Sequence, residues 1–489
     1  MLGMQRKLST PFLVLLTLPA TAMGFALSVQ ISALSWILST EYNLAIHEIG
    51  LVWAAGPLAG IIGQLLIGVL SDRVWVWGGR RRPFIIIGGI LAALMLLALP
   101  HIGLISQSLG LDAVLGVAIT VALALDLSIN VGFNPTRSLI TDVTPEGIAR
   151  TRGYTWMQTV SGSFGVLAYA IGAVFGNYAL IYFAAGLVVL FSLVPAVLVE
   201  EPRVLPGAVH GAHGRAPADK TSLVDLMRLF RPLWAFLLYD VLAMALKIAG
   251  IEPPGMWLEL ACVAFAALLF WQTLTARSAG AQFARQDLVD YRKVLAANSL
   301  SWIGVQTMFV YMISFVQHRF PELGADASGR ILSISFLMLN AVGAALPALV
   351  LLPLAKKYDV VKVHSACLAI MAAGFAGVYL LGFSPLVIYA LMALMGIGWA
   401  AIVSLPFSIM SQRVDQSRIG LYMGVFNLSI VLPQLVVSLG VGLFVSRTAD
   451  KGVIFLIGAV SLALAAIAWR SVSGDTSAQS PVIATAGSH

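Results

Sequence analysis

Residues 178–199 read YALIYFAAGLVVLFSLVPAVLV and contain no charged side chain. A helix rises about 1.5 Å per residue, so this run is long enough to cross a hydrocarbon layer of roughly 30 Å. The stretch that follows, EEPRVLPGAVHGAHGRAPADK at residues 200–220, is rich in Gly, Pro and charged residues and has too few apolar residues to pack as a core segment. The boundary predicts a membrane helix followed by a linker.

Apolar runs of this kind recur along nearly the whole chain. Of its 489 residues, 59% are hydrophobic and 10% are charged, and the mean hydropathy of +0.93 is typical of an integral membrane protein. We expect six long spans on each side of the linker region, at residues 11–37, 49–70, 84–105, 113–140, 154–175, 178–199, 294–316, 331–354, 363–382, 385–409, 420–445 and 453–469. Shorter apolar segments at 233–249 and 256–274 predict an inserted hairpin, giving fourteen transmembrane helices in all.

This pattern divides the chain into four regions. They are an N-terminal six-helix half at residues 1–200, linker segments with the hairpin at 201–293, a C-terminal six-helix half at 294–472 and a disordered cytoplasmic tail at 473–489. Two six-helix halves in an all-α membrane protein are typical of the major facilitator fold, in which the halves rock about a central site. The first apolar run is too long for a signal peptide and lacks a clear cleavage site, so we expect a helix there.

The basic residues predict the orientation of the chain, because Lys and Arg accumulate in cytoplasmic loops. With both termini in the cytoplasm, the 29 Lys and Arg lie on the inner side apart from Lys247, Arg319, Arg330, Arg447 and Lys451. The net charge of +7 then reflects contact with anionic lipid headgroups and not with nucleic acid. We expect a monomer in the plasma membrane, which would be the inner membrane of a bacterium.

Enzyme and sensor functions are disfavoured. The chain has no group of acid, base, nucleophile or metal-ligand residues with catalytic spacing, and the tail after Arg470 is too short for an output domain. Cys262 and Cys367 lie in separate apolar spans and predict packing only. We therefore expect neither a metal nor a cofactor.

One acid lies deep in an expected span. Asp126, in LALDLSINVGFNPTRSLITD at residues 123–142, is about 16 to 20 Å from either end of its helix and so near the bilayer midplane. Asn130, Phe133, Asn134 and Arg137 share its helix face, and such a polar stripe lines a cavity more readily than it faces lipid. Arg137 is about 16 Å along the axis, so the acid needs another partner. A structural alternative is a buried hydrogen bond that only fixes helix packing.

A basic loop follows the second expected span and reads GVLSDRVWVWGGRRRPFIIIGG at residues 68–89. Asp72 could accept hydrogen bonds from a neighbouring helix end, and the arginines could bind carboxylates or headgroups. This chemistry suits a cytoplasmic gate. The alternative is that these arginines only reflect the general excess of Lys and Arg in cytoplasmic loops.

Several stretches resemble the sucrose–proton symporters and their bacterial relatives, within the glycoside-pentoside-hexuronide:cation symporter group. They are GRRRPF after SDR in the basic loop, HEIGLVWAAGPLAGIIGQLLIG at residues 47–68, FLMLNAV at 336–342, SLPFSIMSQ at 404–412 and GLYMGVFNLSIVLPQLVVS at 420–438. In the fourth span, the family pattern of D, N, P, R, L and D falls on Asp126, Asn130, Pro135, Arg137, Leu139 and Asp142. The chain departs from the family at Leu65, where proline is usual, at Ser404, and in its extra hairpin.

The resemblance implies symport of a proton with a disaccharide or glucoside, such as sucrose or maltose, by alternating access. The same fold could instead serve a sodium-coupled glycoside carrier or a sugar exporter. Asp126 would carry the proton. A hydroxyl-rich ligand needs amides and an aromatic platform at mid-membrane, and the candidates are Gln30, Asn130, Gln158, Trp302, Gln306, Asn340 and Asn427, with Gln434. Any one of these could instead make an interhelical hydrogen bond.

The expected gating residues lie nearer the ends of the spans. They are His47 at the outer end of the first helical pair, and Asp72, Arg73, Arg80, Arg81, Arg82, Arg137 and Asp142 on the inner side. The expected partners are thus a sugar, a proton and membrane lipids.

Overall fold

The computed structural model describes residues 2–60, 63, 75–110, 114–145, 148–203, 227–251, 255–277, 283–411, 413–414 and 419–473. These residues are almost entirely helical, with one isolated backbone bridge between Val76 and Gly79. Eleven helices among them are long and apolar enough to span a membrane, and a shorter apolar helix covers Val453–Trp469. The predicted all-α membrane fold is confirmed. Gln64, Leu65, Asp72 and Arg73 lie outside the described residues.

The N-terminal half is built from long helices joined by short connections. Its elements are α1 (Leu2–Arg6), α2 (Thr10–Val29), η1 (Gln30–Leu34), α3 (Ser35–Thr40), α4 (Ile46–Trp53), α6 (Arg82–Ala98), η2 (Leu99–His101), α7 (Ile102–Ser108), α8 (Val114–Val143), α9 (Ile148–Phe175) and α10 (Asn177–Leu198). α2, η1 and α3 form one span, Thr10–Thr40. Inside it η1 is a π-helical segment that begins at Gln30, and such segments are frequent at functional sites.

The C-terminal half follows the hairpin. The hairpin consists of η3 (Arg231–Leu233), α12 (Trp234–Ile248) and α13 (Trp257–Leu274). The half itself contains α14 (Phe283–Arg319), α15 (Ala325–Leu346), η4 (Pro347–Leu351), α16 (Leu352–Lys357), α17 (Val360–Leu381), α18 (Pro385–Ser411), α19 (Ile419–Val436), η6 (Val437–Val441), α20 (Gly442–Arg447) and α21 (Val453–Trp469).

Among the described helices, α14 departs furthest from its expected span. α14 begins at Phe283, eleven residues before the expected start at residue 294, because the polar segment continues as a helix whose Tyr291 is fully buried. α12 has 15 residues and is too short to count among the eleven helices that could span a membrane. The fourteen-span count therefore remains a prediction.

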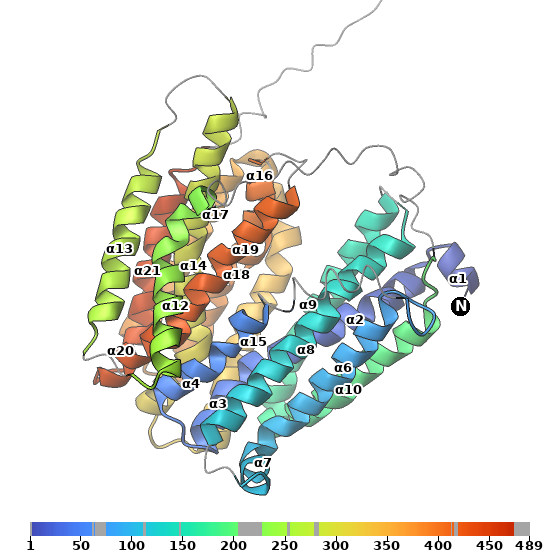
Figure 1. Cartoon of the computed structure of the whole chain (residues 1–489), viewed down its shortest axis with the longest axis horizontal. Coiled ribbons are helices and arrows are strands. Elements are labelled where there is room, and N and C mark those ends of the chain that lie inside the picture. The colour runs from blue at the N-terminus through green and yellow to red at the C-terminus, as the bar shows by residue number, and fades with distance from the viewer. Residues whose placement is uncertain are drawn as a thin grey trace, which may run out of the picture.

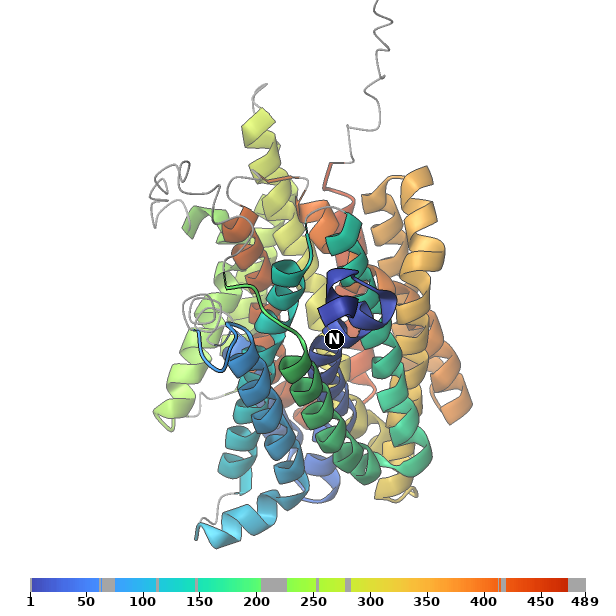
Figure 2. The same ribbon diagram turned by 90° about the vertical axis from the view of Figure 1, so that its right-hand side faces the viewer.

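The two halves form separate helical groups that meet most closely at one end (Figure 1). α2 packs against α9 and α10, α6 packs against α8, and α17 packs against α18 and α21. Figure 1 shows the two groups diverging toward the end where α1 lies, and Figure 2 shows α1 at the same end. We name that end the N-terminal face and the end at Thr40 the closed face.

Hydrogen bonds join the halves at the closed face. Ser35 Oγ donates to the carbonyl of Val310 at 2.9 Å, and the Trp36 indole donates to the carbonyl of Ala325 at 2.8 Å. Ser39 Oγ donates to Gln317 Oε1 at 2.7 Å. The donors all lie on α3, the last part of the first span, so hydrogen bonds hold the two halves together at that end. We call this set of contacts the latch.

A buried polar cluster adds to this latch. The hydroxyl groups of Ser32 and Ser333 lie 2.9 Å apart, and both donate to Asn177 Oδ1, at 3.2 and 3.1 Å. All three residues are buried. They come from η1, α15 and α10, so the cluster connects both halves of the protein.

Candidate functional site

Asp126 lies on α8 and is buried. Its Oδ2 accepts a hydrogen bond of 2.8 Å from the Gln30 amide at the start of the π-helical segment. Among the described residues, no Lys, Arg or His lies within ion-pair distance of Asp126. The partner that the sequence left open is therefore an amide and not a cation.

The Gln30 side chain can serve both protonation states of this acid. Its amide nitrogen donates to the carboxylate, while its Oε1 is buried with no hydrogen-bond partner among the described residues. An amide carries both donors and an acceptor, so a turn of the amide plane would let Oε1 accept the O–H of a protonated Asp126. The pair can hold a proton without a charged neighbour.

Gly56 leaves room for the carboxylate. A Cβ atom at this position would lie 3.2 Å from Asp126 Oδ2, which is closer than most side-chain contacts. A Cβ at Gly60, one turn further, would meet nothing within 4 Å. The segment after α4 thus approaches the acid closely at one glycine.

The polar stripe on α8 is partly engaged by its own helix. The Asn130 amide donates to the carbonyl of Asp126 at 2.8 Å, so at least one of its protons is used locally. The Arg137 guanidinium lies 4.2 Å from the centre of the Phe133 ring and is exposed. The side chain of Asn134 is outside the described set.

The sugar-site candidates of the C-terminal half form two groups. In the first, the Trp399 indole donates to Asn340 Oδ1 at 3.2 Å and its ring lies 6.2 Å from that of Trp302. In the second, the Gln434 amide donates to Gln306 Oε1 at 3.2 Å. Asn427 is half-buried on α19 and makes no hydrogen bond to a described residue, and Gln158 is exposed on α9.

Tyr169 and Trp399 are polar aromatics that the sequence did not single out. The buried Tyr169 hydroxyl on α9 lies beside Ser28 of α2 and Asn340 of α15. Because α15 belongs to the other half, Asn340 lies at the interface between the halves. Both residues sit in apolar helical runs, where an aromatic residue looks like ordinary core. Only the pairing of α9 with α15 distinguishes Tyr169 from a packing residue.

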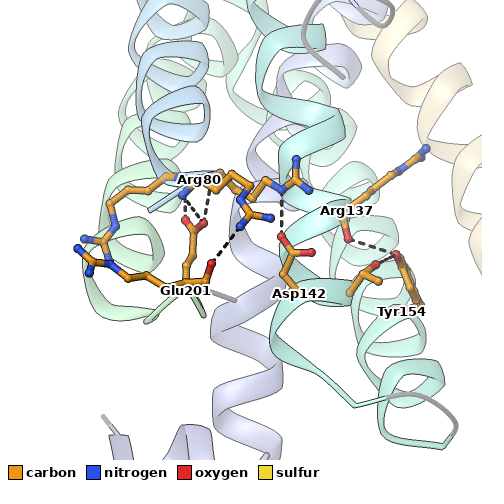
Figure 3. Close-up of polar contacts among 9 residues, drawn as sticks. Arg80, Arg137, Asp142, Tyr154 and Glu201 are labelled. Atoms are coloured by element: carbon orange, nitrogen blue, oxygen red, sulfur yellow. Dashed lines mark hydrogen bonds and ion pairs between the residues drawn. The ribbon is translucent and has the colours of Figure 1, made fainter. Parts of the chain in front are cut away.

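The basic loop at the N-terminal face surrounds a carboxylate that the sequence assigned to a linker. Glu201 accepts hydrogen bonds from the backbone amides of Arg80, Arg81 and Arg82, at 2.6 to 2.8 Å (Figure 3). These amides begin α6, and an anion at a helix N-terminus satisfies its free N–H groups and its dipole. At the other described end of this stretch, Leu229 and Phe230 are buried, so both ends of the expected linker contact the helices.

Two predicted gating residues form a buried ion pair next to Glu201. Arg81 Nε lies 3.0 Å from Asp142 Oδ2, with 6% and 10% of the two side chains exposed. This pair joins the start of α6 to the end of α8 (Figure 3). Close by, the Tyr154 hydroxyl donates to the carbonyl of Arg137 at 3.2 Å, which ties α9 to the same end of α8.

His47 lies at the other end of the molecule. It is half-buried at the start of α4, and a Cβ at Gly442 would come within 3.1 Å of its Cα. The predicted gating residues that the structure describes therefore divide between the closed face and the N-terminal face.

Comparison with known proteins agrees with this architecture. The profile of the Major Facilitator Superfamily matches residues 16–438. The chain belongs to the Major Facilitator Superfamily. Members of this family and the similar proteins named below are membrane transporters and not enzymes, as the sequence predicted.

Similar proteins and solved structures support the family assignment. Over 88% of its length the chain is 24% identical to Sucrose transport protein SUC4 of Arabidopsis thaliana, of which it covers 83%. It is 30% identical over 190 residues to the General alpha-glucoside permease of Schizosaccharomyces pombe, which is 35% of this chain and 34% of that protein. The xylose transporter XylE from E. coli, in its inward open conformation, shares the fold with a TM-score of 0.59 at 15% identity, covering 95% of this chain and 96% of that one.

Proposed function

We propose that the protein is a proton-coupled symporter of a disaccharide or glucoside, such as sucrose or maltose. The observation that carries the proposal is the buried Asp126 carboxylate paired with the amide of Gln30. An ionised carboxylate is costly to bury without a cation, so binding and releasing a proton gives this acid a use. The similarity to proteins named for sucrose and alpha-glucoside transport supports the sugar as cargo.

The sugar would bind between the halves, near the amides and indoles described above. Trp302 and Trp399 offer ring faces, while Asn340, Asn427 and Gln306 offer amides for hydroxyl groups. Asp126 would bind the proton in the N-terminal half. Binding of the proton in one half and of the sugar in the other would then favour the rocking of one half against the other.

The closed face is the extracellular one in this proposal. Both termini and the basic loop would then be cytoplasmic, as the distribution of Lys and Arg predicts, in the inner membrane of a bacterium. The latched residues Ser32, Asn177 and Ser333 would close the outside, while the Arg81–Asp142 pair would hold helix ends on the inside. The transport unit would be a monomer.

Uptake into proteoliposomes tests this proposal. We expect radiolabelled sucrose or maltose to accumulate when a membrane potential and an inward proton gradient are imposed. One proton per sugar supplies about 2.3 kcal/mol per 100 mV, or roughly 50-fold accumulation. An uncoupler should abolish this. Accumulation that ignores the uncoupler and follows a sodium gradient would replace proton coupling with cation coupling, and accumulation only in outward-directed assays would favour an exporter.

A further inference from the structure

A long, mostly apolar slot lies between parts of the hairpin and the C-terminal half. It has a volume of about 620 Å³ and lies between α12 and α13 on one side and α14, α19, η6, α20 and α21 on the other. The hairpin stands at the outer edge of this half in Figure 1. Apart from Tyr239 and Glu259, its lining is apolar, for example at Val263, Ala267, Ile303 and Ile467.

The slot has the length and depth of a lipid chain. Its lining along α13 extends from Met256 to Leu274, which is about 27 Å of helix. Trp257 and Trp271, near the two ends of α13, are exposed, and tryptophans at such positions mark the membrane–water interfaces. The slot therefore runs through the hydrocarbon depth and not across a water-facing surface.

Three arginines lie outside the lining of this slot, beyond the C-terminal end of its α13 side. Arg231 Nη2 donates to Gln272 at 2.6 Å, directly beside the slot residue Trp271. Arg292 of α14 lies close enough to Arg228 and Arg231 for their charges to interact. The Nε of Arg292 is buried and makes no hydrogen bond within the described residues. A positive cluster with an unused donor thus lies where the apolar lining ends.

One carboxylate lies in the lining, toward the other end of the slot. Glu259 lines it there and accepts a hydrogen bond from the Tyr239 hydroxyl at 3.2 Å. A carboxylate would repel an anionic headgroup, whereas the arginines would attract one. The carboxylate within the lining and the arginines beyond it therefore favour an amphiphile with its anion at the arginine end.

We propose that this slot binds an anionic phospholipid, with the phosphate on Arg228, Arg231 and Arg292 and one acyl chain between α13 and the C-terminal half. Basic pockets between membrane helices bind such headgroups. Guanidinium groups suit the phosphate because they donate paired hydrogen bonds. The lipid would fill the space that the hairpin leaves and hold it against α14 and α21.

Native mass spectrometry of the detergent-solubilised full chain tests the site. The probes are palmitoyl-oleoyl phosphatidylglycerol, the matching phosphatidylcholine, and free glycerol phosphate. We expect phosphatidylglycerol to bind at least tenfold more tightly than phosphatidylcholine, and glycerol phosphate not to compete. Competition by glycerol phosphate at equal concentration would mean a free-anion site and overturn the proposal.

Variants of the three arginines test whether they bind the lipid headgroup. Arg228→Gln with Arg231→Gln and Arg292→Gln should remove the preference for phosphatidylglycerol, whereas Lys7→Gln with Lys357→Gln and Lys362→Gln, which removes the same charge elsewhere, should keep it. If the triple variant is not monodisperse, Arg292→Gln alone is used and should lower the preference at least threefold. An unchanged preference in a folded variant overturns the proposal.

A second pair of variants tests whether the slot binds an acyl chain. Ala267→Phe fills it, because Ala267 lines it, and should reduce lipid binding at least fivefold. Leu268→Phe adds a ring at an exposed neighbour that is not part of the lining and should leave binding unchanged. If Ala267→Phe instead abolishes a dimer seen for the original chain, the slot binds a second copy and the proposal is wrong.

Discussion

The amide of Gln30 and the carboxylate of Asp126 lie 2.8 Å apart, although 96 positions separate them in the chain. The bond joins the first and fourth long helices of the N-terminal half at the residue where the π-helical segment begins. A neutral partner leaves the charge of Asp126 uncompensated, so protonation can remove it without breaking an ion pair.

Asp126→Asn should uncouple transport from the proton gradient. Asparagine keeps an acceptor for Gln30 but cannot release a proton, so sugar exchange should persist within about twofold. Accumulation at 100 mV should fall from roughly 50-fold to equilibration. Counterflow and gradient-driven uptake in the same proteoliposomes measure the two effects, and full accumulation by this variant would remove Asp126 from the coupling mechanism.

Gly56→Ala should impair transport, while Gly60→Ala should not. The new Cβ at residue 56 would lie 3.2 Å from Asp126 Oδ2, whereas the one at residue 60 has nothing within 4 Å. Displacing the carboxylate should lower the initial uptake rate about threefold to tenfold, since positioned groups tolerate little movement. Equal rates for the two variants would show that the carboxylate has room to shift.

Glu201→Gln should destabilise the N-terminal half. The variant removes the negative charge at the start of α6, where three backbone amides bind Glu201. We expect a loss of about 1–2 kcal/mol, seen as a fall of roughly 2–4 °C in apparent Tm. Glu200→Gln is the control, because that neighbouring side chain is exposed, and it should leave the melting temperature unchanged.

A disulfide between residues 32 and 333 should stop transport. The hydroxyl groups of Ser32 and Ser333 lie 2.9 Å apart across the two halves, so Ser32→Cys with Ser333→Cys places two thiols at the latch. The native thiols Cys262 and Cys367 are first replaced by Ser. Oxidation should abolish uptake and reduction should restore it.

The matched control for this crosslink lies within one half. The Asn298 amide donates to Ser429 Oγ at 2.9 Å, and both residues belong to the C-terminal half. Oxidised Asn298→Cys with Ser429→Cys should still transport, because the two helices move together. Uptake by the oxidised 32–333 pair would mean that the closed face does not open during transport.

Trp302→Ala should weaken sugar binding without uncoupling transport from the proton gradient. Loss of an aromatic ring beside the bound sugar should raise KM about tenfold, which corresponds to roughly 1.4 kcal/mol, while the accumulation ratio at saturating sugar stays the same. Trp257→Ala, on the exposed side of the hairpin, should leave KM unchanged. A lower accumulation ratio with normal KM would place Trp302 in coupling instead.

The fold was largely predictable because membrane spans depend on local composition. Runs of about 20 apolar residues predict the long helices that the structure describes, and the largest departure is α14, which extends into polar sequence at Phe283. That extension depends on the burial of Tyr291 against Tyr422 of α19, a contact between distant segments that no local pattern records.

The partners in the site were harder to predict than its members. Asp126 stood out because it lies in an apolar run, but nothing in the sequence pairs it with Gln30. The polar residues and the proline around Glu201 predict a linker, whereas its hydrogen bonds depend on the position of α6 beside the end of α10. An unusual residue type in an apolar run, such as Asp126, can be recognised from the sequence. The partners of such a residue depend on which helices pack together, and the sequence alone does not show this.

The hairpin makes the two halves unequal bodies in the bilayer. α12 packs against α19, and α13 packs against α14, so the hairpin travels with the C-terminal half. In the proposed transport cycle the C-terminal half, widened by α12 and α13, would therefore move through the lipid as a broader body than the N-terminal half.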